Sequence, residues 1–299
     1  MPMKRDAKER VVDWLLVALM VLPFVLSMTL KVLLKPAGEG ISITGAQVYF
    51  TIPMPVMDLP ITESQVNSLM VVLSILGLCL YLTHGISVAP HSKRQIVAEW
   101  IVEKVQNMVN SNMGAYFSAF APFIAGIMFI SAFSSLSSLL GLFPPTSDMN
   151  IVAGWAILVF VLITHYKLKG GLLPYVKGFF EPVFIFAPFN IIGEVATPVS
   201  MSFRHYGNVL SGMVISTLVA YALQTLSHML LGWLPGVLGQ FPFLQVGLPA
   251  ILSLYFDIFS GLMQAFIFAL LTTIYISTGF PQEEYERRKA KRKKALHTA

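Results

Sequence analysis

The stretch that decides the fold is Ser200–Leu223, SMSFRHYGNVLSGMVISTLVAYAL, in which Arg204 is the only Asp, Glu, Lys or Arg residue. It belongs to an apolar segment, about 189–226, that is longer and more apolar than a helix of a soluble protein. An arginine near the bilayer centre costs roughly 2.5–3.5 kcal/mol, and a guanidinium cannot escape this cost by losing its proton. Glu194 lies ten residues away, about 15 Å along a helix. The counter-charge of Arg204 must therefore come from elsewhere in the fold or from another chain.

The composition is that of an integral membrane protein. Of the 299 residues, 56% are hydrophobic and 12% are charged, whereas soluble domains carry about 25% charged residues. Much of the basic excess behind the net charge of +5 lies at the two ends of the chain, which is typical of cytoplasmic anchors beside membrane spans. We therefore expect the basic ends to lie beside a lipid bilayer and expect no nucleic-acid partner.

Cofactor and metal motifs are missing from the sequence. The lone Cys79 lies in an apolar segment, so it provides neither a disulfide framework nor a cysteine-based metal site. The sequence contains no Walker A loop and no GxGxxG fingerprint. We therefore expect no cofactor and no nucleotide chemistry on this chain.

Six apolar segments are long enough to enter the membrane, since a helix needs about 20 residues to cross the hydrocarbon. The first segment is long and lacks a small-residue cleavage site, which favours a retained helix over a signal peptide. With the N-terminus in the cytoplasm, the proline-containing loop that ends at about Ser64 lies outside, and both termini lie on the cytoplasmic side. The segments are 11–34, 65–88, 116–142, 151–166, 189–231 and 243–279.

The segment SKRQIVAEWIVEKVQNMVN, residues 92–110, has the pattern of an amphipathic helix that lies in the membrane interface. The last two apolar segments exceed the crossing length, which requires steep tilt or helices partly in the membrane plane. The expected fold is therefore an all-α integral membrane protein. It has about six membrane-embedded helices, the last two long and strongly tilted, plus an interfacial amphipathic helix.

Two polar stripes run along these last two segments. Arg204 and Asn208, followed by Ser211 or Gly212, share one helix face by i, i+4 spacing. The stripe of the final segment, at i, i+3 and i+7, consists of Asp257, Ser260 and Gln264. Stripes on neighbouring tilted helices form a partly aqueous path that ends inside the bilayer.

The stripes also carry a resemblance to a known family. PVSMSFRHYGN, followed by DIFSGLMQAFIFALLTTIYIS, resembles subunit a of the F-type ATP synthase, and ITESQVNSLMVVLSILGLCLYLTHG, GLFPPTSDMN and APFNIIGEVATPVS match its pattern. The resemblance covers about residues 60–279. It implies an extra transmembrane helix and external loop in residues 1–64. Residues 65–299 are then the subunit a core with its ion half-channels and basic cytoplasmic tail.

The resemblance implies a role for the first polar stripe and its partner. Arg204 is then the essential arginine that faces the membrane-embedded carboxylate of the rotating c ring. Asn208 and Gln264 match the polar positions beside it. This assignment agrees with an arginine that has no acid of its own nearby.

The resemblance also places the two half-channels. Asp257, seven residues before the glutamine, takes the position of a titratable group in the half-channel open to the outside. Glu194 lies on the cytoplasmic side of the arginine and lines the other half-channel. Ser260 and His205 are further candidates for the ion path.

The chain departs from the family pattern at one position. Many members carry a second titratable residue nine positions after the arginine, where this chain has Met213. Asp257 then acts alone, or His205, Tyr206 or another group replaces the missing one.

The function implied by the resemblance is that of an ion-translocating stator subunit. It couples the flow of protons, or of sodium ions, to rotation of the c ring and catalyses no bond change itself. The expected partners are the c ring and the peripheral-stalk subunit b. The expected location is a bacterial cell (inner) membrane.

A secondary cation transporter or antiporter is the alternative function, because such proteins also place Asp and Arg within the membrane. It would show repeats, broken helices and a complete ion site of its own, none of which the sequence reveals. A structural scaffold would not need Arg204, Asp257 and Gln264 in hydrocarbon. We therefore favour the stator subunit, with the proton as the preferred ion.

Overall fold

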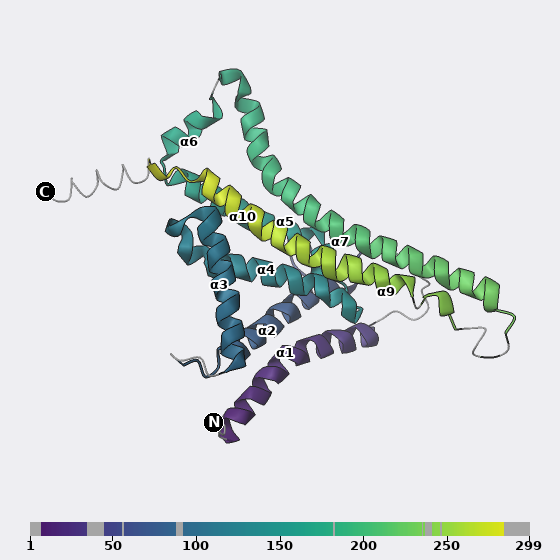
Figure 1. Ribbon diagram of the computed structural model, residues 1–299. Helices are drawn as coiled ribbons and strands as arrows, with labels where there is room; N and C mark the ends of the chain where they lie inside the picture. The colour runs from purple at the N-terminus through teal and green to yellow at the C-terminus, as the bar shows by residue number, and fades with distance from the viewer. Residues whose placement is uncertain are drawn as a thin grey trace, which may run out of the picture.

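The computed structural model describes residues 7–34, 45–55, 57–87, 92–181, 183–234, 236, 241–245 and 247–283, most of them helical (Figure 1). The α-helices are α1 (Ala7–Leu34), α2 (Glu63–Thr83), α3 (Lys93–Met113), α4 (Ala121–Leu136), α5 (Met149–Leu168), α6 (Leu172–Phe179), α7 (Ala187–Leu231), α9 (Leu248–Ser253) and α10 (Gly261–Gly279). The short 3-10 segments are η1 (Ala115–Phe120), η2 (Ser137–Leu140), η3 (Pro145–Ser147), η4 (Phe184–Phe186) and η5 (Phe243–Gln245), and η6 (Leu254–Ser260) is π-helical. The strands are β1 (Val48–Ile52) and β2 (Leu59–Thr62).

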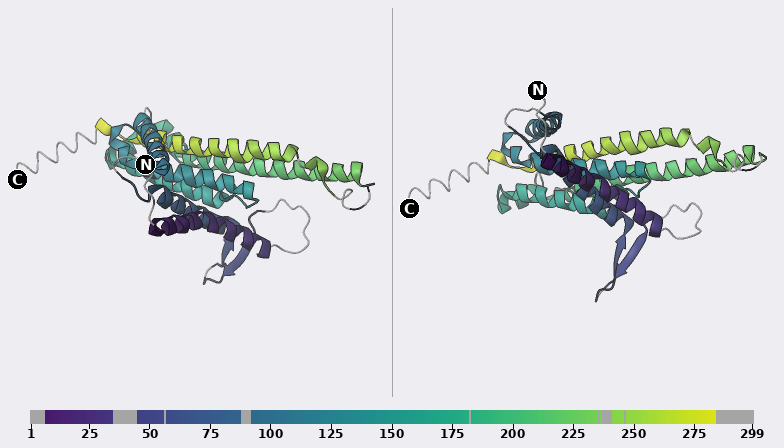
Figure 2. Two further views of the ribbon diagram at one scale, coloured as in Figure 1. Left: turned by 60° about the horizontal axis from the view of Figure 1, so that its bottom comes forward. Right: turned by 90° about the horizontal axis from the view of Figure 1, so that it is seen from below.

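Six segments of the described chain are helical, long and apolar enough to cross a membrane, which confirms the expected all-α membrane fold. Their bounds are Lys8–Leu34, Glu63–Thr83, Tyr116–Leu140, Met149–Leu168, Phe184–Leu231 and Phe243–Gly279. The 45 residues of α7 extend about 68 Å, more than twice the thickness of a roughly 30 Å hydrocarbon core. A helix of this length must be strongly tilted. Figure 2 shows α7 beside the final helical segment of α9, η6 and α10, with α7 and the α9 end of that segment reaching well beyond the neighbouring helices.

α3 is amphipathic, as the sequence predicts, and is not one of the six spans. Val105, Val109 and Met113 are buried against the rest of the protein, whereas Val97 and Trp100 are exposed. An exposed apolar face on a helix that does not cross the membrane is typical of an interfacial helix. Its position in the interface stays a prediction.

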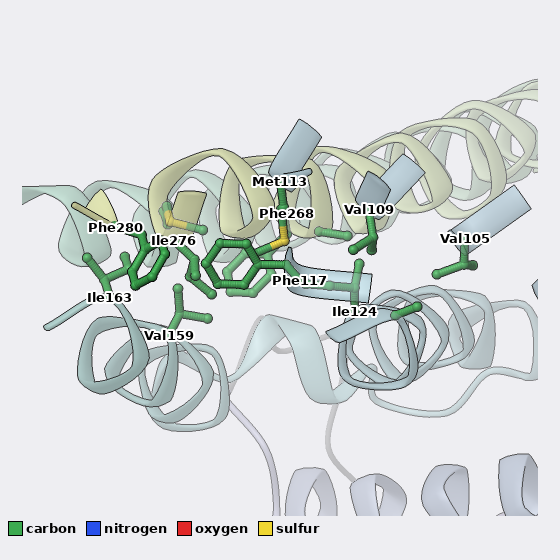
Figure 3. Close-up of a cluster of buried hydrophobic side chains, with 13 residues drawn as sticks. Val105, Val109, Met113, Phe117, Ile124, Val159, Ile163, Phe268, Ile276 and Phe280 are labelled. Atoms are coloured by element: carbon green, nitrogen blue, oxygen red, sulfur yellow. The ribbon is translucent and has the colours of Figure 1, made fainter. Parts of the chain in front are cut away.

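The hydrophobic core joins α3, α4, α5 and α10 (Figure 3). Val109, Ile124 and Val159 are completely buried there, and Phe268 and Ile276 of α10 reach into the same cluster. The final helix is therefore held against its neighbours by one buried face, which also includes the polar residues Gln264, Thr272 and Thr273.

α1 packs closely along α2, so the N-terminal span is an integral part of the fold. The Ser74 hydroxyl donates a hydrogen bond of 2.7 Å to the Met20 carbonyl oxygen. A Cβ atom at Gly77 would lie 2.8 Å from the Met20 nitrogen, so only glycine permits this approach. Small residues commonly allow such backbone contact between membrane helices.

A β-hairpin precedes α2, where the sequence predicts only a loop with several prolines. β1 pairs with β2 in antiparallel register, from Val48 opposite Thr62 to Ile52 opposite Leu59. Pro60 is tolerated because both strands of a two-stranded sheet are edges, where a missing N–H leaves no ladder bond unmade. Burial, followed by the nearby Glu63 charge, raises the pKa of Tyr49 in β1 to about 12.

The basic ends of the chain, on which the expected location of both termini depends, lie largely outside the described residues. Residues 1–6 and 284–299 belong to this part. The assignment of both termini to one side therefore stays a prediction.

The approach of α10 to α4 depends on a glycine. A Cβ atom at Gly261 would lie 2.7 Å from the Ser135 Cβ atom, closer than real side chains allow. Gly126 of α4 has no heavy atom within 4 Å of an added Cβ and offers a matched comparison.

We predict that Gly261→Ala lowers the midpoint of thermal unfolding in detergent, because the added methyl group pushes α10 away from α4. The expected loss is about 1–3 kcal/mol, the usual cost of overpacking. Gly126→Ala should leave the midpoint unchanged or raise it, since alanine is the better helix former. Equal midpoints for the two variants would contradict the close packing.

Candidate functional site

The polar stripes of α7 and the final helical segment face each other. The Asn208 side-chain amide donates a hydrogen bond of 2.7 Å to the Ser260 hydroxyl, across 52 residues of sequence. One turn further along α7, a Cβ atom at Gly212 would lie 2.9 Å from Cδ1 of Phe256. The predicted neighbourhood of the two stripes is thus confirmed at Asn208 and Ser260.

These two contacts set the register of the antiparallel pair. Four residues forward along α7, from Asn208 to Gly212, correspond to four residues back along its partner, from Ser260 to Phe256. The same step in the other direction places Gln264 level with Arg204. Gln264 is buried, with 5% of its surface exposed, so it belongs to the interior of the helix pair.

Arg204 lies on the outer surface of α7. Its side chain is exposed, as is that of the preceding Phe203. Within the described part of the chain, no group forms a hydrogen bond or an ion pair with the guanidinium. The sequence prediction that its counter-charge is not a neighbour on the same helix agrees with this geometry.

His205 points into the helix assembly and is completely buried. Its Nε2 atom lies 3.2 Å from the Ser131 hydroxyl of α4, and the rings of Trp155 and Phe268 pack edge-on against it. Consecutive helical residues point about 100° apart, so burying this ring helps to turn Arg204 toward the surface. The sequence did not identify Ser131, because a serine in an apolar helix has no distinguishing pattern.

Asp257 lies in the π-helical segment η6, which the sequence analysis missed. The Ser253 hydroxyl, one turn earlier, donates a hydrogen bond to the Asp257 carboxylate. A single π-turn is frequently found at functional sites, because the extra residue changes the direction of its side chains. By the register above, Asp257 is level with about Ser211, roughly 10 Å beyond Arg204 along α7.

Glu194 lies on the other side of Arg204, about 15 Å back along α7. Its Oε1 atom is 3.1 Å from Nζ of Lys167 and accepts a hydrogen bond of 2.9 Å from the Tyr175 hydroxyl. Burial, and then the hydrogen bond to Glu194, raise the pKa of Tyr175 to about 12. The sequence analysis proposed neither Lys167 nor Tyr175 as a site residue.

A cavity of about 520 Å³ opens beside Glu194. Its lining includes the side chains of Lys167, Tyr175, Asn190 and Thr278. Pro198 lies between this cavity and Arg204 and bends α7, because proline removes a hydrogen bond from the helix interior (Figure 1). The bend separates the Glu194 cavity from the Asn208–Ser260 contact.

The described residues contain no group of three or more His, Cys, Asp or Glu side chains that lie close enough together to hold a metal ion. The acids at the site, Glu194 and Asp257, lie on opposite sides of Arg204 along α7. Their arrangement fits two separate groups that exchange single cations.

Comparison with known proteins identifies the family. The sequence model described as ATP synthase A chain matches residues 66–277, more than half of the chain. ATP synthase subunit a of Bacillus subtilis (strain 168) is 32% identical over 236 residues, which cover 73% of this chain and 93% of that protein. ATP synthase subunit a, sodium ion specific, of Propionigenium modestum is 26% identical over 275 residues, covering 81% and 88%. The chain therefore belongs to the ATP synthase subunit a family, the multi-pass membrane subunits of the ion-translocating Fo sector of F-type ATP synthase.

Proposed function

We propose that this chain is the stator subunit that provides two half-channels and the essential arginine of the rotary motor. The observation that carries the proposal is Arg204, an exposed cation in the middle of an apolar span with no partner in the described residues. Such a charge is costly in hydrocarbon unless a carboxylate of another chain meets it. The membrane-embedded carboxylate of a c ring is the partner that we assign to it.

The proposed cycle moves one cation at a time. A ring carboxylate takes a cation from one half-channel, becomes neutral and can then turn through lipid. On its return it meets Arg204, whose positive charge favours the ionised carboxylate and so releases the cation into the other half-channel. Each charge that crosses the membrane yields about 2.3 kcal/mol per 100 mV, which the ring converts into torque. This chain makes and breaks no covalent bond in the cycle.

We assign Asp257, with Asn208, Ser260 and Gln264, to the half-channel open to the outside. Three observations support this assignment: the Asn208–Ser260 hydrogen bond, the π-turn at Asp257 and the burial of Gln264. Met213 occupies the position where many relatives carry a second titratable group, so Asp257 is the one carboxylate of this stripe. His205 contacts Ser131 away from Arg204, and we assign it a lesser role in the path.

We assign Glu194 and the adjoining cavity to the cytoplasmic half-channel. The cavity is lined by the Glu194 carboxylate and by an ammonium and a phenol that both lie within hydrogen-bonding distance of it, which is a polar and charged environment suited to cations. Arg204 lies between the Glu194 cavity and Asp257, so the two half-channels do not form a continuous pore. An ion must therefore travel on the ring to pass from one side to the other.

The remaining assignments follow from membership of the family. We propose subunit b as a second partner, a bacterial cell membrane as the location and the cytoplasm for both termini. Residues 1–64 form the extra N-terminal helix and external segment, and residues 65–299 form the core. A secondary cation transporter or antiporter remains the competing function, and it would move ions without a c ring.

We predict that Arg204→Ala abolishes ATP synthesis driven by a membrane potential while the complete synthase still assembles. Removing a preorganised charge of this kind costs about a hundredfold in rate or more. Synthesis in vesicles and passive ion leakage are the measurements. As a control, Lys104→Ala removes an exposed cation from α3 and should leave the rate of ATP synthesis and the passive ion leakage unchanged. Normal synthesis by the Arg204 variant would make Arg204 a structural residue.

We predict that Asp257→Asn lowers ATP-driven ion pumping at least about tenfold, because an amide cannot exchange a cation. Ser253→Ala keeps the carboxylate but removes its hydrogen bond, so it should lower pumping less. Initial rates of pumping by reconstituted vesicles measure both effects. If Asp257→Asn pumps at the normal rate, the outer half-channel does not use this carboxylate.

We predict that ATP synthesis by the unmutated enzyme is independent of sodium concentration, because we propose the proton as the coupling ion. The similarity to a relative named as sodium ion specific makes sodium the specific alternative. Synthesis measured at low and high sodium, with the membrane potential held constant, decides between them. Stimulation by sodium would assign the sodium ion instead.

A further inference from the structure

The Lys167–Glu194 ion pair lies where two cavities adjoin. The larger cavity, about 520 Å³, and a smaller one, about 180 Å³, are both lined by Lys167, Glu194, Thr197, Thr278 and Gly279. The Lys167 ammonium and the Glu194 carboxylate are 3.1 Å apart at this shared boundary. The ion pair therefore lines both cavities.

The Lys167 side chain lies in a slot that the fold provides for it. A Cβ atom at Gly279 would lie 3.2 Å from both Cγ and Cε of Lys167, so the absence of a side chain there makes room for the lysine stem. A Cβ atom at Gly170 would lie 2.2 Å from Cγ of Pro281, so the end of α5 and the residues after α10 are in direct contact. Packing therefore positions the lysine stem, and the attraction to Glu194 positions the ammonium.

The two groups of the pair differ in burial. The Glu194 side chain is 10% exposed and that of Lys167 is 30% exposed. A carboxylate this buried is costly without a counter-charge. Lysine carries its charge on a flexible four-carbon stem, so the ammonium can withdraw into the larger cavity while its stem stays in place.

The Tyr175 hydroxyl, which also contacts Glu194, cannot replace Lys167 as the counter-charge. The Tyr175 hydroxyl donates to the same Oε1 atom, and with a pKa of about 12 it stays neutral and protonated at physiological pH. Tyr275 lines the smaller cavity, and a phenol has no cationic form that could pair with a carboxylate. Among the described residues, Lys167 is the cation that is paired with Glu194.

We propose that Lys167 is a tethered counter-ion that is displaced from Glu194 by each coupling cation and returns when that cation leaves. Competition from the ammonium keeps the carboxylate from retaining the cation, so Lys167 sets the affinity of the inner half-channel. When the cation is a proton, an O–H bond forms on the Glu194 carboxylate as the proton arrives and breaks as it leaves, so the ion pair with its original net charge is restored after each passage. The inference rests on the proposed role of Glu194 and adds a positioning residue from α5.

The test uses the complete synthase in inverted vesicles, where ATP hydrolysis draws cations from the cytoplasmic side. The cation concentration is varied as the pH of the medium, or as sodium chloride if synthesis proves sodium-dependent. Initial rates give a half-saturating concentration and a maximal rate. Lys167→Met retains the apolar stem along Gly279 without the charge, and Lys167→Arg retains the charge.

We predict that Lys167→Met half-saturates at a cation concentration about tenfold lower, with a lower maximal rate, because the unpaired carboxylate holds the cation longer. Lys167→Arg should restore both values toward normal. Gly279→Ala, which displaces the lysine stem but keeps its charge, should shift them in the same direction by a smaller amount. It also provides the test if Lys167→Met does not assemble.

Unchanged kinetics of Lys167→Met, or equal defects in the Met and Arg variants, would overturn the inference. Glu194→Gln separates this failure from a failure of the proposed function. If Glu194→Gln pumps normally, the cytoplasmic half-channel does not use Glu194 at all. If Glu194→Gln is defective while Lys167→Met is normal, Glu194 remains in the path and Lys167 has no part in it.

Discussion

The site depends on how α7 is oriented about its own axis, because this orientation decides which of its residues are buried and which face outward. His205 is completely buried against Ser131, Trp155 and Phe268, which belong to α4, α5 and α10. Because the next residue back points about 100° away, this packing directs Arg204 out of the helix assembly. The fold thus bears the cost of an exposed guanidinium in an apolar span, and we propose that a carboxylate of another chain offsets this cost.

Glycine residues allow the helices that carry the site residues to pack closely against one another. Gly212 lets Phe256 approach α7, and Gly261 lets α10 approach Ser135 of α4. Membrane helices gain stability from packing and hydrogen bonds, since lipid supplies little hydrophobic driving force between them. The Asn208–Ser260 hydrogen bond forms where this packing is closest, so the polar stripes and the small residues depend on each other.

The sequence predicts the six spans, the amphipathic α3 and the two polar stripes, because hydrophobic length and helical spacing are local properties. It does not predict the π-turn at Asp257, since one extra residue in a turn leaves no periodic signal. It also misses Lys167 and Ser131, which become relevant only through tertiary contacts with Glu194 and His205. The sequence analysis did not predict the β-hairpin, because prolines are normally excluded from strands. Edge strands tolerate proline, and both strands of this hairpin are edge strands.

The two acids beside Arg204 are held in different ways, and this difference affects how tightly each would bind a cation in the proposed path. Glu194 is paired with an ammonium, whereas Asp257 accepts a hydrogen bond from the neutral Ser253 hydroxyl. A cation at Glu194 must compete with a charge already present, but a cation at Asp257 meets no such competitor among the contacts of the described residues. In the proposed path, the Glu194 site therefore holds a cation less tightly than the Asp257 site, while the electrochemical gradient sets the direction of flow.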